Sequence, residues 1–247
     1  MSSDTLLFDT IEDTIEAFRD GNFVIVVDST SRENEGDLII AASAMTPEKM
    51  AFMVRYTSGI ICTPIMPDLA GMLDLPLMVR EGGSEDPNKT AYTISIDANH
   101  PSITTGISAH DRALTCNTLA SADLILVPKP SHFRRPGHIF PLIVRPGLIC
   151  ERRGHTEAAM ELCRLAELPF VGVISELVDD GIEIKGKAER KEPGMMRRAE
   201  CIEFGKQWGL KCCCIEDLVA FVEAEKPYVS SLPEQTSQHT PRDTKNT

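Results

Sequence analysis

Short apolar runs and helical patterns alternate along most of this chain. Runs of strand length, apolar or alternating in character, predict strands at residues 23–27, 38–42, 58–63, 91–97, 123–127 and 170–177. Apolar positions spaced three or four residues apart predict helices near 8–20, from Thr46 onward, and at 111–122, 156–168, 195–208 and 215–225. Polar segments predict loops at 80–90, 129–138 and 179–194.

No linker and no internal repeat interrupts this alternation, so the pattern predicts a single domain over residues 1–227, which we expect to be a catalytic domain. Several connections, notably the one between the runs at 23–27 and 38–42, are too short for a helical crossover. We therefore expect an α/β domain of the α+β type, with a mixed β-sheet layered with helices. Residues 228–247 are polar with little apolar content, which predicts a disordered tail.

Charge and cysteine content narrow the possible functions. Of 247 residues, 25 are Lys or Arg and 37 are Asp or Glu, which gives a net charge of −12 and argues against a nucleic-acid or anionic-membrane surface. No apolar run reaches the length of a membrane span, and no signal-like N-terminus is present. The eight cysteines include no C-x-x-C pair, so we expect reduced thiols in a cytoplasmic protein.

An acidic loop at residues 32–37, between two predicted strands, is the first candidate site. Its sequence RENEGD places three carboxylates and one guanidinium in six positions. Like charges at this spacing repel unless something positive gathers them, and the usual agents are a divalent cation or a phosphorylated ligand. The loop is thus either part of a site for such a cation or ligand, or a solvated acidic hairpin.

A second candidate site lies where a loop enters the predicted helix at 156–168. Backbone N–H groups at a helix start favour anions, and Gly154, Arg152 and Thr156 could complete a phosphate cradle there. The alternative is that Thr156 is a helix N-cap with charged neighbours. His155 could add an imidazole to a metal site begun by a carboxylate of the acidic loop, or it could be a solvated loop histidine.

Two further residues have the chemistry of acid–base groups. His138 opens an apolar run after the basic segment, so it could exchange protons at the edge of a pocket. Glu176 is the one charged residue of the run at 170–177, and a carboxylate at the end of a buried strand is costly unless it is paired or used. Strand ends of α/β sheets are common places for ligands.

Taken in order, these motifs resemble the 3,4-dihydroxy-2-butanone 4-phosphate synthase family of riboflavin biosynthesis. The matching segments are RENEGD at 32–37, YTSGIIC at 56–62, LPLMV at 75–79, TAYTISID at 90–97, TGISAHDR at 105–112, GHIFPL at 137–142, GHTE at 154–157 and EL at 176–177. One departure is Arg153, which stands where the family commonly has the first of two glycines.

The resemblance implies a lyase that converts D-ribulose 5-phosphate to L-3,4-dihydroxy-2-butanone 4-phosphate and formate, with magnesium or manganese. It also implies homodimers with shared active sites, in which His138 comes from the second chain. By the same resemblance, Glu33 and His155 are metal ligands, and catalysis uses His138, Glu176, Glu33 and Asp37. Substrate contacts are then expected from Arg32, Glu33, Asp37, Cys62, Thr105, Arg152, Gly154, His155, Thr156 and Glu176.

Two other functions remain open from the residues. A metal-dependent phosphosugar isomerase or aldolase would use the same enediol and metal but would release no formate. A metabolite-binding sensor would bind without turnover, and it would not need the acid–base groups His138 and Glu176.

Overall fold

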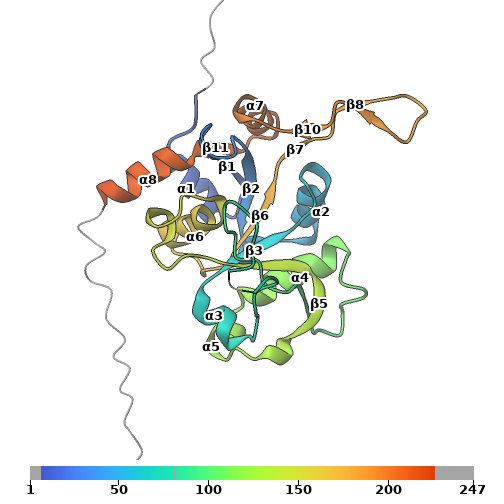
Figure 1. Cartoon of the computed structure of the whole chain (residues 1–247), viewed down its shortest axis with the longest axis vertical. Coiled ribbons are helices and arrows are strands. Elements are labelled where there is room, and N and C mark those ends of the chain that lie inside the picture. Colours follow the sequence, from blue (N-terminus) through green and yellow to red (C-terminus); the bar gives the residue numbers. More distant parts are fainter. Residues whose placement is uncertain (1–6, 81, 226–247) are drawn as a thin grey trace, which may run out of the picture.

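A computed structural model describes residues 7–80 and 82–225 of the chain. Its central element is a sheet of seven strands (Figure 1). Its strand order is β11 (Lys211–Cys214), β1 (Val24–Val27), β2 (Gly36–Ala41), β6 (Gly172–Glu176), β3 (Cys62–Ile65), β5 (Phe133–Ile143) and β4 (Ile96–Ala98). The pairs β1–β11 and β3–β5 are parallel, and the other neighbours are antiparallel. The predicted mixed sheet is therefore confirmed.

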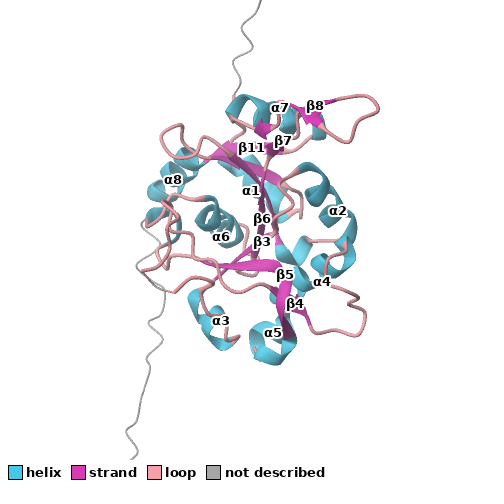
Figure 2. Ribbon diagram, turned by 45° about the vertical axis from the view of Figure 1, so that its right-hand side comes forward, coloured by secondary structure: helices cyan, strands magenta, loops and turns pink. Residues whose placement is uncertain are grey.

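Helices cover both faces of this sheet (Figure 2). One face carries α1 (Ile11–Arg19), α6 (His155–Leu165) and α8 (Ile215–Ala224). The other carries α2 (Pro47–Tyr56), α4 (Ala109–Leu119) and α7 (Arg198–Trp208). Each layer encloses its own apolar cluster, because successive side chains of a buried strand point to opposite faces.

Local sequence signals account for the helix starts. The Thr46 hydroxyl accepts a hydrogen bond from the backbone N–H of Lys49, and Pro47 is the first helical residue of α2, as predicted.

The remaining helical elements of the described residues are short. They are the helices α3 (Pro67–Met72) and α5 (Ala122–Leu126) and the 3₁₀ turns η1 (Ala42–Ala44), η2 (Pro130–His132) and η3 (Leu148–Cys150).

Several predictions of secondary structure were wrong or incomplete. Residues 123–127 are not a strand: Ser121 accepts from the Leu124 N–H and starts α5. The predicted basic loop at 129–138 is largely strand β5, and the sequence pattern missed β11. The loop at 179–194 contains two short pairs, β7 (Val178–Asp179) with β10 (Gly194–Met195) and β8 (Ile182–Glu183) with β9 (Arg190–Lys191).

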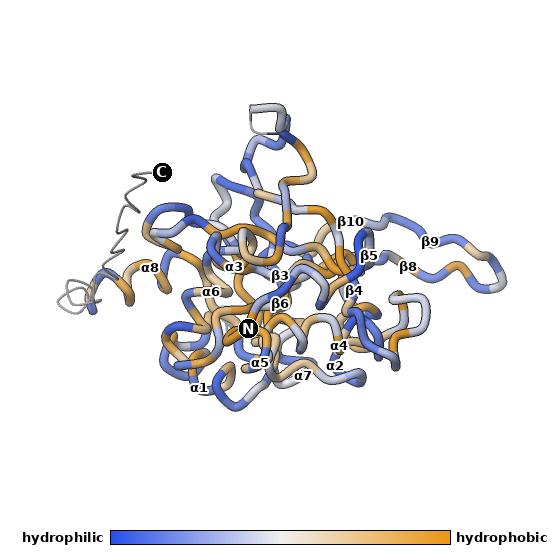
Figure 3. Tube along the Cα trace, turned by 90° about the horizontal axis from the view of Figure 1, so that it is seen from below, coloured by the Kyte–Doolittle hydropathy of each residue, from blue (hydrophilic) through white to orange (hydrophobic). Residues whose placement is uncertain are grey.

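The β8–β9 arm projects from the body of the molecule, whereas hydrophobic stretches follow the central strands (Figure 3). Within residues 7–80 and 82–225, none of the helices combines the length and the apolar character that crossing a membrane requires. Residues 228–247, predicted to form a disordered tail, lie outside the described residues.

Candidate active site

Polar residues at the strand ends face the layer that contains α6. In β2, Ile39 packs in the cluster with α6, so Asp37, two residues earlier, points to the same side. The same alternation places Glu176, two residues after Ile174 in β6, on this side. Asp28 follows β1 and is buried. The sheet thus presents several carboxylates to the start of α6.

Asp28 organises the acidic loop that the sequence singled out. Its carboxylate accepts the backbone N–H of Glu33 at 3.1 Å and of Glu35 at 2.9 Å, and it pairs with Arg32 at 2.8 Å. Burial raises the pKa of Asp28, but the hydrogen bonds from Glu35 and Arg32 outweigh it, so the pKa lies below its usual value. The loop is therefore folded around a buried carboxylate and is not a solvated hairpin.

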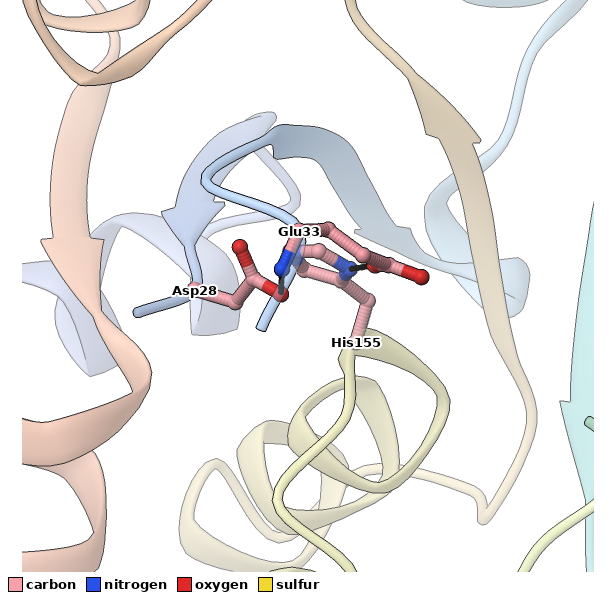
Figure 4. A group of neighbouring side chains, drawn as sticks. All are labelled: Asp28, Glu33 and His155. Atoms are coloured by element: carbon pink, nitrogen blue, oxygen red, sulfur yellow. Dashed lines mark hydrogen bonds and ion pairs between the residues drawn. The ribbon is translucent and has the colours of Figure 1, made fainter. Parts of the chain in front are cut away.

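His155 reaches from the start of α6 into this loop (Figure 4). Its Nδ1 lies 3.8 Å from Glu33 Oε2 and 3.5 Å from Asp37 Oδ1. Ligand atoms of Asp28, Glu33 and His155 all lie within 4.8 Å of one another, so the group could hold a metal ion. The predicted proximity of His155 and Glu33 is thus present in the structure.

Burial controls the protonation of this group. It lowers the pKa of His155 to about 4, so the imidazole is neutral at pH 7 and keeps a lone pair for a metal. Burial and the neighbouring Glu176 hold the pKa of Asp37 well above its usual value. Asp37 Oδ1 and His155 Nε2 are buried, and neither has a hydrogen-bond partner among the described residues. Such atoms are costly unless a ligand uses them.

The start of α6 is tied to the acidic loop through Arg152. Its guanidinium pairs with buried Glu157 and donates to Thr90 Oγ1 at 3.0 Å and to the Asn88 carbonyl at 3.2 Å. The Asn88 amide in turn donates to the Glu33 carboxylate. The predicted loop at 80–90 thereby joins the two candidate sites into one.

Gly154, and not Thr156, is the N-cap of α6. A Cβ at Gly154 would lie 2.4 Å from Nη1 of Arg152, so a side chain there would collide with the guanidinium. Thr156 is buried in the first helical turn. The capping alternative for Thr156 was therefore wrong, and no side chain of the described residues caps the start of α6.

Glu176 and Cys62 lie beside this group. Glu176 Oε2 accepts from the Ser58 hydroxyl at 2.9 Å, and Glu176 is the cross-strand neighbour of Asp37. Cys62 pairs with Ile174 of β6 and is buried. Burial, followed by the charges of Glu176 and Asp37, raises the pKa of the Cys62 thiol.

His138 and Thr105 form a second group further along the sheet. His138 is on β5, and its Nδ1 lies 2.9 Å from Asp97 Oδ2, whereas Thr105 is exposed in the adjacent loop. Cys62 of β3 pairs with both Ile174 of β6 and Phe140 of β5, so β3 separates the strand of Glu176 from the strand of His138, and at this level the two strands lie about 10 Å apart. No hydrogen bond or ion pair within the described part of the chain joins His138 to Glu33 or His155.

Sequence reasoning missed several residues of this region. Asp28 and Asp97 each stand at the polar end of an apolar or alternating run, which is the signal that identified Glu176. Asn88 carries no comparable signal, because its contacts with Glu33 and Arg152 depend on how a loop folds.

Comparisons with known proteins extend over nearly all of the described residues. The family model for 3,4-dihydroxy-2-butanone 4-phosphate synthase matches residues 12–221. The synthase of that name from Pyricularia oryzae is 59% identical over 216 residues, which cover 87% of this chain and 90% of the relative. The one from Saccharomyces cerevisiae is 43% identical over 221 residues, with 88% and 100% covered.

Solved structures give the same result. A crystal structure of 3,4-dihydroxy-2-butanone 4-phosphate synthase in complex with two magnesium ions is similar with a TM-score of 0.84 and 58% identity, and the match covers 88% of this chain and 98% of that one. A cation-free form is similar with a TM-score of 0.81 and 57% identity, covering 88% and 99%.

Proposed function

Because the chain belongs to the 3,4-dihydroxy-2-butanone 4-phosphate synthase family, we propose that it converts D-ribulose 5-phosphate to L-3,4-dihydroxy-2-butanone 4-phosphate and formate, a step of riboflavin biosynthesis. The observation that carries this proposal is the group of Glu33, Asp37 and His155, in which two buried polar atoms, Asp37 Oδ1 and His155 Nε2, have no hydrogen-bond partner among the described residues. A ketose phosphate has adjacent oxygens that could form hydrogen bonds with these two atoms, directly or through a bound metal ion.

Glu33 and His155 are the proposed ligands of a magnesium ion, with manganese as a substitute. A carboxylate oxygen suits such a hard ion, and the neutral imidazole of His155 could add a nitrogen ligand, because its Nε2 has no hydrogen-bond partner among the described residues. Asp28 is less available, because both of its oxygens already bind the loop. When bound, the ion would stabilise the negative charge that develops on an enediol.

Asp37, Glu176 and His138 are the proposed acid–base groups. The raised pKa of Asp37, caused by burial and by Glu176, favours a carboxyl group that can donate a proton. Glu176 is half-buried, and only one of its oxygens accepts a hydrogen bond from a described residue, so the other could accept a proton. Enolisation, loss of water and skeletal rearrangement each move protons, so more than one such group is needed.

The phosphate is proposed to bind at the start of α6, where Arg152, Gly154 and Thr156 present a guanidinium, backbone N–H groups and a hydroxyl. Arg32 and Thr105 are proposed to contact the rest of the substrate. Cys62 lines the same face of the sheet.

Release of formate tests the proposed function. Ribulose 5-phosphate labelled with ¹³C should give one equivalent of labelled formate and one of the four-carbon phosphate, followed by NMR. A phosphosugar isomerase would yield a five-carbon product and an aldolase would yield no formate. A sensor would bind the substrate and return it unchanged. Each of these results would replace the proposed function.

Arg152 gives a test of phosphate binding that separates binding from stability. Removing the Arg152 guanidinium alone would leave the buried carboxylate of Glu157 without its charge partner, which typically lowers the free energy of unfolding by about 3–5 kcal/mol. We therefore expect Arg152→Ala combined with Glu157→Gln to fold and to bind substrate roughly 10- to 100-fold more weakly, measured by calorimetry. Glu157→Gln alone is the control. Equal losses for substrate and for a dephosphorylated analogue would show that Arg152 does not contact the phosphate.

Cys62 gives a test of where the pocket lies. Its thiol is buried beside Glu176 and Asp37 and its pKa is raised, so alkylation should be slow. Substrate with magnesium should slow it further, as followed by mass spectrometry of peptides. Cys116 is also buried with a raised pKa but lies in the cluster on the other face of the sheet, so its labelling should not change. Unchanged labelling of Cys62 would place it outside the pocket.

We also propose that the chain acts as a homodimer in the cytoplasm. Two exposed apolar side chains are close in sequence to residues discussed above: Ile60, which is 50% exposed, is two residues from Ser58, and Ile107, which is 52% exposed, is two residues from Thr105. A second subunit that covers them could bring its His138 to the group around Glu33. The eight cysteines are free thiols, which fits a reducing compartment.

A further inference from the structure

The turn that joins α2 to β3, residues 57–61, passes the end of β6, where Glu176 lies (Figure 1). The backbone N–H of Ser58 donates to the Glu176 carbonyl at 2.8 Å, and the Ser58 hydroxyl donates to Glu176 Oε2 at 2.9 Å. One residue therefore binds both the main chain and the carboxylate of Glu176. Because Ser58 is exposed, its hydroxyl contributes nothing to the packing of the core.

Two buried hydroxyl groups stand behind Ser58. Thr57 is 7% exposed, and its hydroxyl donates to the Met53 carbonyl at 2.6 Å. Ser175 is 1% exposed, and its hydroxyl donates to Thr57 Oγ1 at 2.8 Å. The hydroxyl oxygens of Ser175 and Ser58 lie 3.3 Å apart. The three hydroxyls thus form one chain between a carbonyl of α2 and the carboxylate of Glu176.

The protons of this chain can be placed one by one, because each hydroxyl has a single proton to donate. A carbonyl only accepts, so the Thr57 proton points to Met53, and Thr57 must accept from Ser175. The Ser58 proton then has two possible acceptors, Glu176 at 2.9 Å and Ser175 at 3.3 Å. The carboxylate is both nearer and charged, so it receives the Ser58 proton.

The backbone of the turn fixes the place of the Ser58 hydroxyl. The next residue, Gly59, has a φ of +75°, which glycine adopts without strain. Its N–H donates to Thr57 Oγ1 at 3.2 Å, and its carbonyl accepts from Nη1 of Arg112 in α4 at 3.3 Å. The Ile60 N–H donates to the Ser58 hydroxyl oxygen at 3.3 Å. The turn is therefore held from α2 and from α4.

We propose that Ser58 is a positioning residue that holds Oε2 of Glu176 and so presents Oε1 to the substrate for proton exchange. Oε1 accepts no hydrogen bond from a described residue. When Oε1 takes a proton, the bonding electron pair stays on the substrate, and Oε2 continues to accept from Ser58. Oε1 later returns that proton. Without the hydroxyl the carboxyl group could turn, since the last torsion of a glutamate side chain is soft.

This role rests on the proposed function, because it needs Glu176 to act in turnover. The contact itself can be tested without turnover, by ¹³C NMR of the full chain labelled at the glutamate Cδ. Glu176→Gln identifies the Glu176 signal by its loss. Ser58→Ala keeps the backbone N–H that donates to Glu176 and changes an exposed position, so the variant should fold.

We expect the Glu176 Cδ signal to shift in Ser58→Ala, because the carboxylate loses its hydrogen bond. In Ser58→Thr, which keeps a hydroxyl, the signal should stay near its parental position. Ser131→Ala changes an exposed serine in η2 and is the matched control, so it should leave the Glu176 signal unchanged.

Kinetics then separate positioning from a general structural role. Ser58→Ala should lower kcat by about 10- to 100-fold, the usual effect of losing a hydrogen bond to a charged group, with KM little changed. Ser58→Thr should recover most of the lost rate. In a Glu176→Gln background, Ser58→Ala should have almost no further effect, because the carboxylate that it positions is gone.

Three kinetic results would overturn the role of Ser58. They are a parental kcat in Ser58→Ala, which would mean that water replaces the hydroxyl, equal losses in Ser58→Ala and Ser58→Thr, and an undiminished loss when Glu176 is already glutamine. An unchanged Glu176 signal in Ser58→Ala is read without substrate, so it would overturn the role whether or not the chain turns over. A shifted signal in a chain that releases no formate would instead count against the proposed function.

Discussion

Replacing Glu33 by glutamine should remove metal-dependent turnover while the chain keeps its fold. The side chain is 31% exposed and lies in a loop between strands, so packing does not depend on its charge. Glutamine keeps the size and the acceptor oxygen for Asn88 but loses the negative charge near His155. Loss of such a ligand should cost about 4 kcal/mol of transition-state stabilisation, or about 10³-fold in rate.

The measurements are steady-state turnover with saturating magnesium, magnesium binding by calorimetry, and thermal unfolding. Glu35→Gln is the matched control, because Glu35 is in the same loop but its carboxylate pairs with Arg197 at 3.4 Å. We expect that control to work at close to the parental rate. Near-parental turnover by Glu33→Gln itself would remove Glu33 from the metal site.

The apolar pattern correctly predicted those helices and strands whose buried apolar side chains follow the regular spacing of the element. Helix α6 and strand β6 were found because their apolar positions repeat regularly over a full element. The pattern failed where tertiary pairing decides. The apolar run at 123–127 suits a strand or a helix, and only the Ser121 cap settles it. Strand β5 contains Arg134 and Arg135, and it forms because β3 and β4 flank it.

The candidate site was predictable to a similar extent. The acidic loop and the start of α6 each carry recognisable chemistry, and the structure brings Glu33 and His155 together. The role of Asp28 could not be read from the chain, since two of its hydrogen bonds come from backbone N–H groups placed by the loop conformation. The ion pair of Arg152 with Glu157 could not be predicted either, because charged residues in a sequence are usually expected to be exposed to solvent.

Mixing two inactive variants should restore activity if His138 completes the site of the other subunit. His138→Ala and Glu33→Gln should each lack turnover as pure dimers. After subunit exchange, about half of the dimers should be mixed, and each mixed dimer has one site with both residues intact. Activity should therefore return to about one quarter of the parental value. Exchange is verified independently with two tags of different mass by native mass spectrometry.

The control for this experiment is a pair of residues that one chain places together. Glu33 Oε2 and His155 Nδ1 lie 3.8 Å apart in the same subunit. A mixture of Glu33→Gln with His155→Ala has no arrangement with an intact site, so it should stay inactive after the same exchange. Recovery in both mixtures would indicate contamination or repair rather than sharing. No recovery in either, after verified exchange, would mean that His138 serves its own chain's site, and the roughly 10 Å that separates β6 from β5 across β3 would then have to be spanned by the substrate.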